Sequence, residues 1–256
     1  MQKVRPKKSI GQHFLTDKNI ALKIVDSLTG EGCRTVLEIG PGMGVLTEYL
    51  ITRHAHFKAA EIDSESILYL QQHFPQNDFI IAADILKLDF AQFDAPLALI
   101  GNLPYYISSQ IFFKVLENYT QVNEVVCMIQ KEVAERIAAP PGSKTYGILS
   151  VLLQTWYDID YLFTVHEHCF NPPPKVKSAV IRLTRNQRNH LTCNHLQLKA
   201  VVKQAFNQRR KTLRNSLKNI CINLEMDKEM MGKRPEQLSV EEFIELTQLI
   251  YGSKTE

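Results

Sequence analysis

Short apolar runs alternate with amphipathic stretches from about residue 20 to residue 185, and this alternation limits the possible folds more than any other feature. The runs have the length and β-branched composition of buried strands, and the stretches between them have helical periodicity. Repetition of strand, helix and strand predicts an α/β fold, with a parallel sheet between two layers of helices. We expect strands over residues 36–39, 57–62, 79–83, 97–101 and 125–130, and helices over 21–28, 45–53, 64–73, 108–119 and 132–138.

The pattern changes after the Pro-Pro-Gly sequence at residues 140–142. Residues 148–156 are apolar and predict a buried helix, and two strands without a helix between them follow at 157–166 and 176–185. Such a pair suggests an antiparallel hairpin at the sheet edge. Later residues are helical over 196–220 and 240–251, so we expect one domain over residues 1–188 and a small all-helical domain over residues 189–256.

Composition excludes several classes of protein. With 45% hydrophobic and 22% charged residues, the chain has an ordinary globular composition. No apolar run reaches the roughly 20 residues needed to span a bilayer, and the basic N-terminus lacks the apolar segment of a signal peptide. We therefore expect no membrane segment. The five cysteines show neither a disulfide framework nor metal-ligand spacing, so we also expect no metal and a cytoplasmic location.

The net charge of +3 conceals a strong segregation of charge. Residues 175–218 carry twelve basic side chains and no acidic one, whereas residues 11–174 have a net charge of −9. Four more cations lie within the first ten residues. A segment of this kind is either a contact surface for a polyanion or a solvated face balanced by the acidic body, and composition alone leaves both open.

A glycine-rich loop follows the first strand of the expected sheet. Its sequence is EIGPGMG at residues 38–44, with an acid two residues before the first glycine. Glycine allows a tight turn and close approach of a ligand to the backbone. The acid would repel a pyrophosphate but suits a cationic ligand, and the sulfonium and ammonium groups of S-adenosylmethionine fit that demand. A tight turn without a ligand is the alternative.

Acidic residues also end the next two strands. Glu61 lies 21 residues after Gly40, where an acid accepts hydrogen bonds from ribose hydroxyls in doubly wound folds. Asp84 is placed to accept the exocyclic amine of an adenine, with Ile62 and Ile85 as apolar walls. The alternatives are a surface acid for Glu61 and a helix cap for Asp84. Together with the glycine loop, these acids favour an adenosyl ligand.

The sequence NLPY at residues 102–105 ends the fourth strand. The adenine N6 amine is a poor nucleophile, because its lone pair is delocalised into the ring. The Asn102 side-chain oxygen and the Leu103 carbonyl can accept its two N–H bonds and draw the nitrogen toward a nucleophilic geometry. Pro104 stiffens the loop, and Tyr105 offers a ring on which an extruded base can stack. An Asn-x-Pro turn is the alternative.

Two further segments suggest contacts to nucleic acid. Phe170 could stack opposite Tyr105 as the second wall of a base clamp, and Lys175 could reach a phosphate; a rigid edge-strand turn is the alternative. Within the basic segment, helical spacing would align one row of cations for an RNA backbone. That row comprises Arg210, Arg214 and Lys218, and the cations Arg209 and Lys211 lie next to Arg210 in the sequence. The same spacing would direct Phe206, Leu213 and Leu217 to the core.

Taken together, these motifs resemble those of the small-subunit ribosomal RNA adenine dimethyltransferases, the KsgA family. The resemblance extends over nearly the whole chain. It rests on GQHFL at 11–15, EIGPGMG at 38–44, EID at 61–63, NLPY at 102–105, QKEVA at 130–134, FNPPPKV at 170–176, NQRRK at 207–211 and RPEQL at 234–238.

The resemblance implies a Rossmann-like S-adenosylmethionine-dependent methyltransferase domain followed by a small C-terminal all-helical domain. It also implies transfer of four methyl groups to two adjacent adenines in the 3′-terminal hairpin of small-subunit (16S) rRNA, within an immature 30S particle whose maturation the enzyme assists, and a monomer. It places Tyr105 and Phe170 at the target base. The residues that it places at the cofactor are His13, Leu15, Gly40, Glu61, Asp84 and Asn102. Position 13 is more often Asn in this family, and here it is His.

Three alternatives share part of this evidence. Large-subunit rRNA adenine methyltransferases of macrolide resistance carry the core motifs, but residues 207–211 and 234–238 resemble the small-subunit family instead. DNA adenine methyltransferases typically have Pro-Pro after the Asp or Asn, which Leu103 does not match. An RNA-binding assembly factor that keeps the fold without catalysis is the third.

Overall fold

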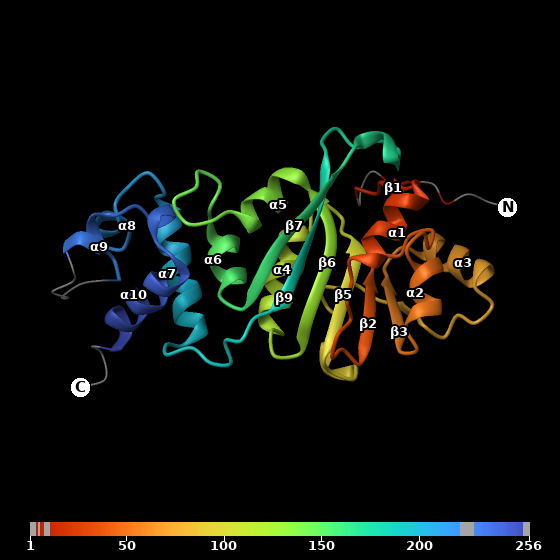
Figure 1. Ribbon diagram of the computed structural model, residues 1–256, viewed down its shortest axis with the longest axis horizontal. Coiled ribbons are helices and arrows are strands. Elements are labelled where there is room, and N and C mark those ends of the chain that lie inside the picture. Colours follow the sequence, from red (N-terminus) through yellow and green to blue (C-terminus); the bar gives the residue numbers. More distant parts are fainter. Residues whose placement is uncertain (1–3, 5, 8–10, 221–227, 253–256) are drawn as a thin grey trace. The chain divides into compact units, whose positions relative to one another are not determined.

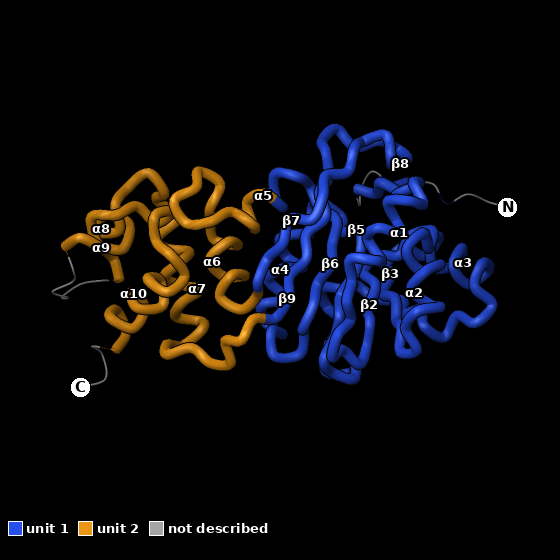
Figure 2. The backbone as a smooth tube through the Cα atoms, in the orientation of Figure 1, with its two compact units in different colours: residues 1–134, 158–185 blue, residues 135–157, 186–256 orange. Residues whose placement is uncertain are grey.

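The computed structural model describes residues 4, 6–7, 11–220 and 228–252, so most of the basic N-terminal tail and Cys221 lie outside the described residues. The chain forms two compact units (Figure 2). One comprises residues 1–134 and 158–185, and the other comprises residues 135–157 and 186–256. Within the described part of the chain, no helix is both long and apolar enough to cross a membrane.

The first unit is built on a sheet whose strands have the order β4-β3-β2-β5-β6-β9-β7 (Figure 1). Neighbouring strands from β4 to β6 are parallel, and β9 is antiparallel to β6. The strands are β2 (Thr35–Ile39), β3 (Phe57–Glu61), β4 (Ile80–Ala82), β5 (Leu97–Asn102), β6 (Val122–Gln130), β7 (Tyr157–Val165) and β9 (Ser178–Arg185). The five strands predicted for the parallel sheet are thus confirmed, and β7 lies at the sheet edge beside β9.

Helices connect these strands. They are α1 (Lys18–Asp26), α2 (Thr47–Arg53), α3 (Ser64–His73), α4 (Ser108–Glu117) and α5 (Lys131–Ala138), with short 3₁₀ turns η2 (Phe90–Gln92) and η3 (Glu167–Cys169). Aspartates precede and cap two of these α-helices: Asp17 caps α1 and Asp63 caps α3 by accepting backbone N–H groups. A second small sheet pairs β1 (Phe14–Leu15) with β8 (Phe170–Asn171).

The order of the strands places a ligand site at the carboxyl ends of β2, β3 and β5. The chain winds outward from β2 in one direction through β3 and β4, and in the other through β5 and β6. Ligands of open α/β sheets bind where the strand order reverses in this way. β5 also approaches β2 closely, because a Cβ on Gly101 would lie 2.5 Å from the carbonyl oxygen of Ile39.

The second unit is helical. It contains α6 (Ile148–Gln154), α7 (His195–Asn207), α8 (Leu213–Ser216), the 3₁₀ turn η4 (Pro235–Gln237), α9 (Lys228–Gly232) and α10 (Val240–Gly252). Aromatic rings join its core: Phe206 lies 6.3 Å from Tyr146 and 6.0 Å from Phe243, measured between ring centroids.

The predicted division at residue 188 needs one correction. The second unit resumes at residue 186, close to the prediction, but it also takes residues 135–157 from within the first predicted domain. The reason is the apolar character of α6, whose residues from Leu149 to Leu153 are all buried. Contacts of α6 with α7 and α10 make this segment part of the helical core.

The prediction of one helix over residues 196–220 is wrong. Helix α7 ends at Asn207, Gln208 leaves the helical conformation, and the short α8 begins at Leu213. Like charges four residues apart, such as Arg210 and Arg214, disfavour a continuous helix. In addition, the backbone N–H of Leu213 donates to the carbonyl of Lys233 at 2.9 Å instead of to its own helix. The cations of this segment therefore do not form one row on one helix face.

Candidate active site

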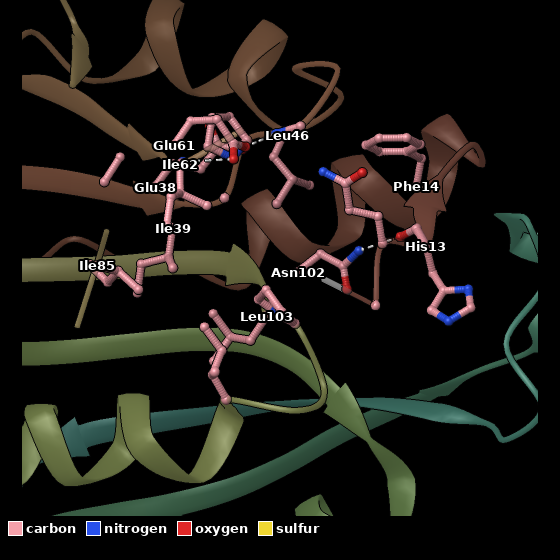
Figure 3. A pocket seen from close by; sticks show the side chains of 18 of the residues that line it. His13, Phe14, Glu38, Ile39, Leu46, Glu61, Ile62, Ile85, Asn102 and Leu103 are labelled. Atoms are coloured by element: carbon pink, nitrogen blue, oxygen red, sulfur yellow. Dashed lines mark hydrogen bonds between the residues drawn. The ribbon is translucent and has the colours of Figure 1, made fainter. Parts of the chain in front are cut away.

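A cavity of about 290 Å³ opens at the carboxyl ends of β2, β3 and β5 (Figure 3). Every residue predicted to bind the cofactor lines it, and so do the acceptor residue Leu103 and the platform residue Tyr105. The predicted residues in its wall are His13, Leu15, Gly40, Glu61, Ile62, Asp84, Ile85, Asn102, Leu103 and Tyr105. Residues as far apart in the sequence as His13 and Tyr105 thus meet around one cavity.

The glycine loop forms the floor of this cavity. Gly40, Gly42 and Gly44 all have positive φ, at 66°, 57° and 77°, which side-chain-bearing residues rarely adopt. No atom lies within 4 Å of the position that a Cβ on Gly40 would occupy. On Gly42 a Cβ would lie 3.0 Å from the ring of Phe14. Gly40 therefore leaves its backbone open to a ligand, whereas Gly42 lets the N-terminal segment pack on the loop.

Glu38 lies beneath the loop with 1% of its surface exposed. The hydroxyl of Thr47, at the start of α2, donates to its Oε2 at 2.6 Å. Burial raises the pKa of Glu38 to about 8, against the opposing effect of the Thr47 hydrogen bond. Burial therefore favours the neutral form of this carboxyl at the cavity.

Glu61 ties the end of β3 to the glycine loop. Its Oε2 accepts the backbone N–H of Gly42 at 3.0 Å, and its Oε1 accepts those of Ile62 and Asp63, each at 2.9 Å. Burial raises the pKa of Glu61, and these backbone hydrogen bonds partly offset the increase. The carboxyl group is therefore fixed in orientation at the cavity wall.

Asp84 caps a turn and also lines the cavity. Its Oδ1 accepts the backbone N–H of Leu86 at 2.9 Å, so the side chain caps the turn that follows β4, and the residue also lines the cavity. Beside it, Ile85 is buried, while 61% of Ile62 is exposed. An apolar wall thus stands next to the Asp84 side chain at the end of β4.

Asn102 is oriented by a contact to the N-terminal segment. Its amide nitrogen donates to the carbonyl of His13 at 3.0 Å (Figure 3). Because a carbonyl can only accept, this bond fixes which end of the amide is nitrogen. No described residue donates to Oδ1, so this oxygen remains available as an acceptor. The next residue is also anchored, since the N–H of Leu103 donates to the carbonyl of Met128 at 3.0 Å.

Tyr105 is held from two sides. Its hydroxyl shares a hydrogen bond of 2.6 Å with the hydroxyl of Ser178, the first residue of β9. The imidazole of His13 stacks on its ring with centroids 5.7 Å apart and an interplanar angle of 27°. Nδ1 of His13 in turn donates to the carbonyl of Pro172 at 2.8 Å. The ring of Tyr105 is therefore fixed in orientation.

The structure does not place Phe170 opposite Tyr105 as the second wall of a base clamp. Phe170 is only 4% exposed and pairs with Leu15 in the small sheet, where it belongs to the apolar core. The imidazole of His13, not Phe170, lies beside Tyr105. Lys175 is exposed on the loop that follows Phe170 and is not part of the cavity wall.

Among the predicted RNA-contacting cations, Arg209 differs from the others. Its guanidinium donates to the carbonyl of Lys144 and lies 4.0 Å from the carboxylate of Glu236. Both partners belong to the same helical unit, so Arg209 supports that unit's structure. The remaining cations of this segment, Arg210, Lys211, Arg214 and Lys218, are exposed.

Sequence reasoning missed two contacts that shape the site. Ser178 is fully buried against Tyr105, and only the adjacent FNPPPKV motif hinted that this segment matters. Lys7 of the N-terminal tail forms an ion pair with Asp63 and lies 3.2 Å from Glu65. Burial would raise the pKa of Asp63, but hydrogen bonds from Lys7 and Ser66 bring it below its usual range. No local pattern predicts a contact across 56 residues.

Comparison with known proteins identifies the family to which the chain belongs. The family model "Ribosomal RNA adenine dimethylase" matches residues 3–251. The "Ribosomal RNA small subunit methyltransferase A" of Cytophaga hutchinsonii is 58% identical over 98% of this chain and 100% of its own length. The protein of the same name from Phocaeicola vulgatus is 56% identical, covering 95% and 89% of the two chains.

Two solved structures show the same architecture. A dimethyladenosine transferase from Plasmodium falciparum has a TM-score of 0.79 and 26% identity, and the match covers 94% of this chain and 98% of that one. The 23S rRNA methyltransferase ErmE has a TM-score of 0.69 at 22% identity, covering 91% and 99%, which shows likeness of fold alone. The fold is therefore the expected Rossmann-like methyltransferase fold, and the chain belongs to the ribosomal RNA adenine dimethylase family.

Proposed function

We propose that this protein dimethylates N6 of two adjacent adenines in the 3′-terminal hairpin of small-subunit (16S) rRNA, and that it does so with the cavity at the ends of β2, β3 and β5. The observation that carries the proposal is the arrangement of Asn102 beside Tyr105: a free amide oxygen of fixed orientation next to a fixed aromatic ring. Relatives named for small-subunit rRNA methylation support this choice of substrate.

As a member of this family, the chain is an S-adenosylmethionine-dependent rRNA adenine dimethyltransferase. The cavity fits that cofactor by the chemistry of its walls. The open backbone of Gly40, the carboxyls of Glu61 and Asp84 and the apolar side chains of Ile62 and Ile85 would hold it. When bound, it supplies an electrophilic methyl group on a positively charged sulfur. The buried carboxyl of Glu38 favours positive charge near the loop.

The chain's own contribution at the target base is to position it and to activate its nitrogen. Asn102 Oδ1 and the Leu103 carbonyl accept the two N–H bonds of the adenine amine. These contacts favour a pyramidal nitrogen whose lone pair is no longer delocalised into the ring. Tyr105 stacks on the base, which must leave its helix to reach the cavity. Because His13 and Ser178 already hold the ring, little ordering is needed when the base binds.

The contact to RNA is assigned to exposed cations. We assign it to Lys175 of the first unit and, in the second, to Arg210, Lys211, Arg214 and Lys218. The substrate that fits these assignments is the rRNA of an immature 30S particle, on which the protein assists maturation. We further propose that it acts as a monomer in the cytoplasm, consistent with its scattered cysteines.

Replacement of Asn102 tests the proposal. Wild-type protein and the Asn102→Ala variant would be given unmethylated small subunits and tritiated S-adenosylmethionine. We expect transfer by the wild type and a loss of about 100-fold or more in kcat for the variant, because one of the two acceptors is gone. Undiminished methylation by Asn102→Ala would refute the acceptor mechanism. Absence of transfer by the wild type would favour an RNA-binding factor without catalysis.

A further inference from the structure

Two consecutive tyrosines follow β5 in opposite environments. Tyr105 is held by Ser178 and by the ring of His13. Tyr106 is 57% exposed, although it lines the same cavity. No hydrogen bond or ring contact joins Tyr106 to any residue within the described part of the chain. An exposed aromatic ring beside a binding cavity is a candidate contact for the rest of the substrate.

The backbone beneath Tyr106 is nevertheless well fixed. The N–H of Ile107 donates to the carbonyl of Pro104 at 3.2 Å, and the hydroxyl of Ser108 donates to the carbonyl of Tyr105 at 3.1 Å. On one side the ring borders Gly11, where an added Cβ would lie 3.5 Å from it. Tyr106 therefore offers a solvent-facing ring on a rigid turn, so binding would cost little conformational entropy.

We infer that Tyr106 is a second stacking platform, which binds the nucleobase next to the target adenine in the RNA strand. This inference rests on the proposed function, because it takes the base in the cavity to be part of an RNA. A base that leaves its helix gives up stacking with its neighbours, and an aromatic side chain at the cavity mouth can replace one of those contacts. Tyr105 would then hold the reacting base, and Tyr106 would hold the adjoining base and keep the strand in register.

The enzymatic test compares Tyr106→Ala with Tyr106→Phe. Loss of one base stack should raise KM for unmethylated small subunits by roughly 5- to 150-fold in Tyr106→Ala, while the dissociation constant for S-adenosylmethionine stays unchanged. Tyr106→Phe keeps the ring and should behave as the wild type. Leu68→Ala is the matched control, because Leu68 is 58% exposed and lies on α3 outside the cavity. An unchanged KM in Tyr106→Ala would overturn the inference.

A second arm changes the RNA instead of the protein. Small subunits would carry uridine in place of the adenine next to the one whose methylation is measured. Because uracil stacks more weakly than adenine, we expect KM of the wild type to rise and the difference between wild type and Tyr106→Ala to shrink by at least half. An undiminished difference would mean that the ring contacts something other than this base. Absence of methylation by the wild type on natural subunits would instead refute the proposed function itself.

Discussion

The side chains assigned to the reaction are oriented by residues distant in the sequence. Asn102 is held by the carbonyl of His13, and Tyr105 is held by the hydroxyl of Ser178. Neither partner needs to touch a substrate to affect the reaction. Ser178 lies outside the cavity wall, so replacing its hydroxyl should lower the rate of methylation without removing any group that takes part in it.

The contact between Tyr105 and Ser178 can be tested by a double-mutant cycle. Tyr105→Phe and Ser178→Ala each remove the same hydrogen bond, and each should lower kcat by about 5-fold, since a typical hydrogen bond contributes about 1 kcal/mol. The double variant should be no slower than either single variant, because the bond is lost only once. Single-turnover methylation of small subunits measures all four proteins, and multiplication of the two losses would contradict the account.

Glu38 makes a prediction about pH. Its pKa in the folded protein is about 8, compared with an ordinary value of 4.5, so the folded state keeps a proton that the unfolded state loses. The stability that this proton contributes is present below about pH 4.5 and is lost as the pH rises toward 8. Glu38→Gln, which keeps the shape without the charge, should therefore gain stability relative to the wild type as the pH rises through this window, by at most about 1 kcal/mol per pH unit. Urea unfolding at several pH values measures the difference; a difference independent of pH would contradict the shift.

At the scale of elements, the close approach of β5 to β2 explains why the next-to-last residue of β5 is a glycine, Gly101. A Cβ there would collide with the carbonyl of Ile39, which is backbone and cannot swing away. We expect Gly101→Ala to lower the free energy of unfolding by about 1–3 kcal/mol. Gly232→Ala is the control, since nothing lies within 4 Å of its added methyl group. Equal stability of the two variants in urea unfolding would contradict this packing.

The elements that local sequence predicts well are those whose pattern and burial agree. β2 is an example: all five of its residues are buried, and its glycine loop marks its end. The ends of these strands then place the cofactor residues without further information, because parallel strands end on one side of a sheet. For this reason the cofactor residues predicted from strand ends lie in the wall of the cavity, whereas His13 and Leu15, expected only from the family resemblance, come from the N-terminal segment.

The elements that sequence misplaced depend on contacts distant along the chain. The break after Asn207 is secured by a hydrogen bond to Lys233, and α6 joins the helical unit through α7 and α10. The aromatic ring of Phe170 suggested a role in base stacking. However, Phe170 pairs with Leu15 in the small sheet, and its side chain packs in the core. Periodicity describes one segment at a time and contains no information on such partners.

At the scale of the whole molecule, positive charge is concentrated in residues 175–218 and negative charge in residues 11–174. The acids include those of the cavity, and the cations include the exposed side chains assigned to RNA. Segregation of this kind suits an enzyme that binds a cationic cofactor and a polyanionic substrate at different surfaces.

The exposed cations and Arg209 should respond differently to substitution. Arg210→Glu combined with Lys211→Glu should weaken binding to immature small subunits and reduce its dependence on salt, with little change in stability. Arg209→Ala should mainly destabilise the helical unit, by about 1 kcal/mol, because it removes a hydrogen bond within that unit. Filter binding at several salt concentrations and thermal unfolding separate the two effects. Unchanged binding by the double variant would contradict the RNA assignment.

The most direct test of the central claim is to map the base that receives the methyl group. Unmethylated small subunits would be incubated with tritiated S-adenosylmethionine and wild-type protein, and with Asn102→Ala in parallel. The account predicts that the wild type labels N6 of two adjacent adenines in the 3′-terminal hairpin. It predicts that the rate of labelling by the variant is lower by about 100-fold or more. Label on another base, or equal label from Asn102→Ala, would contradict it.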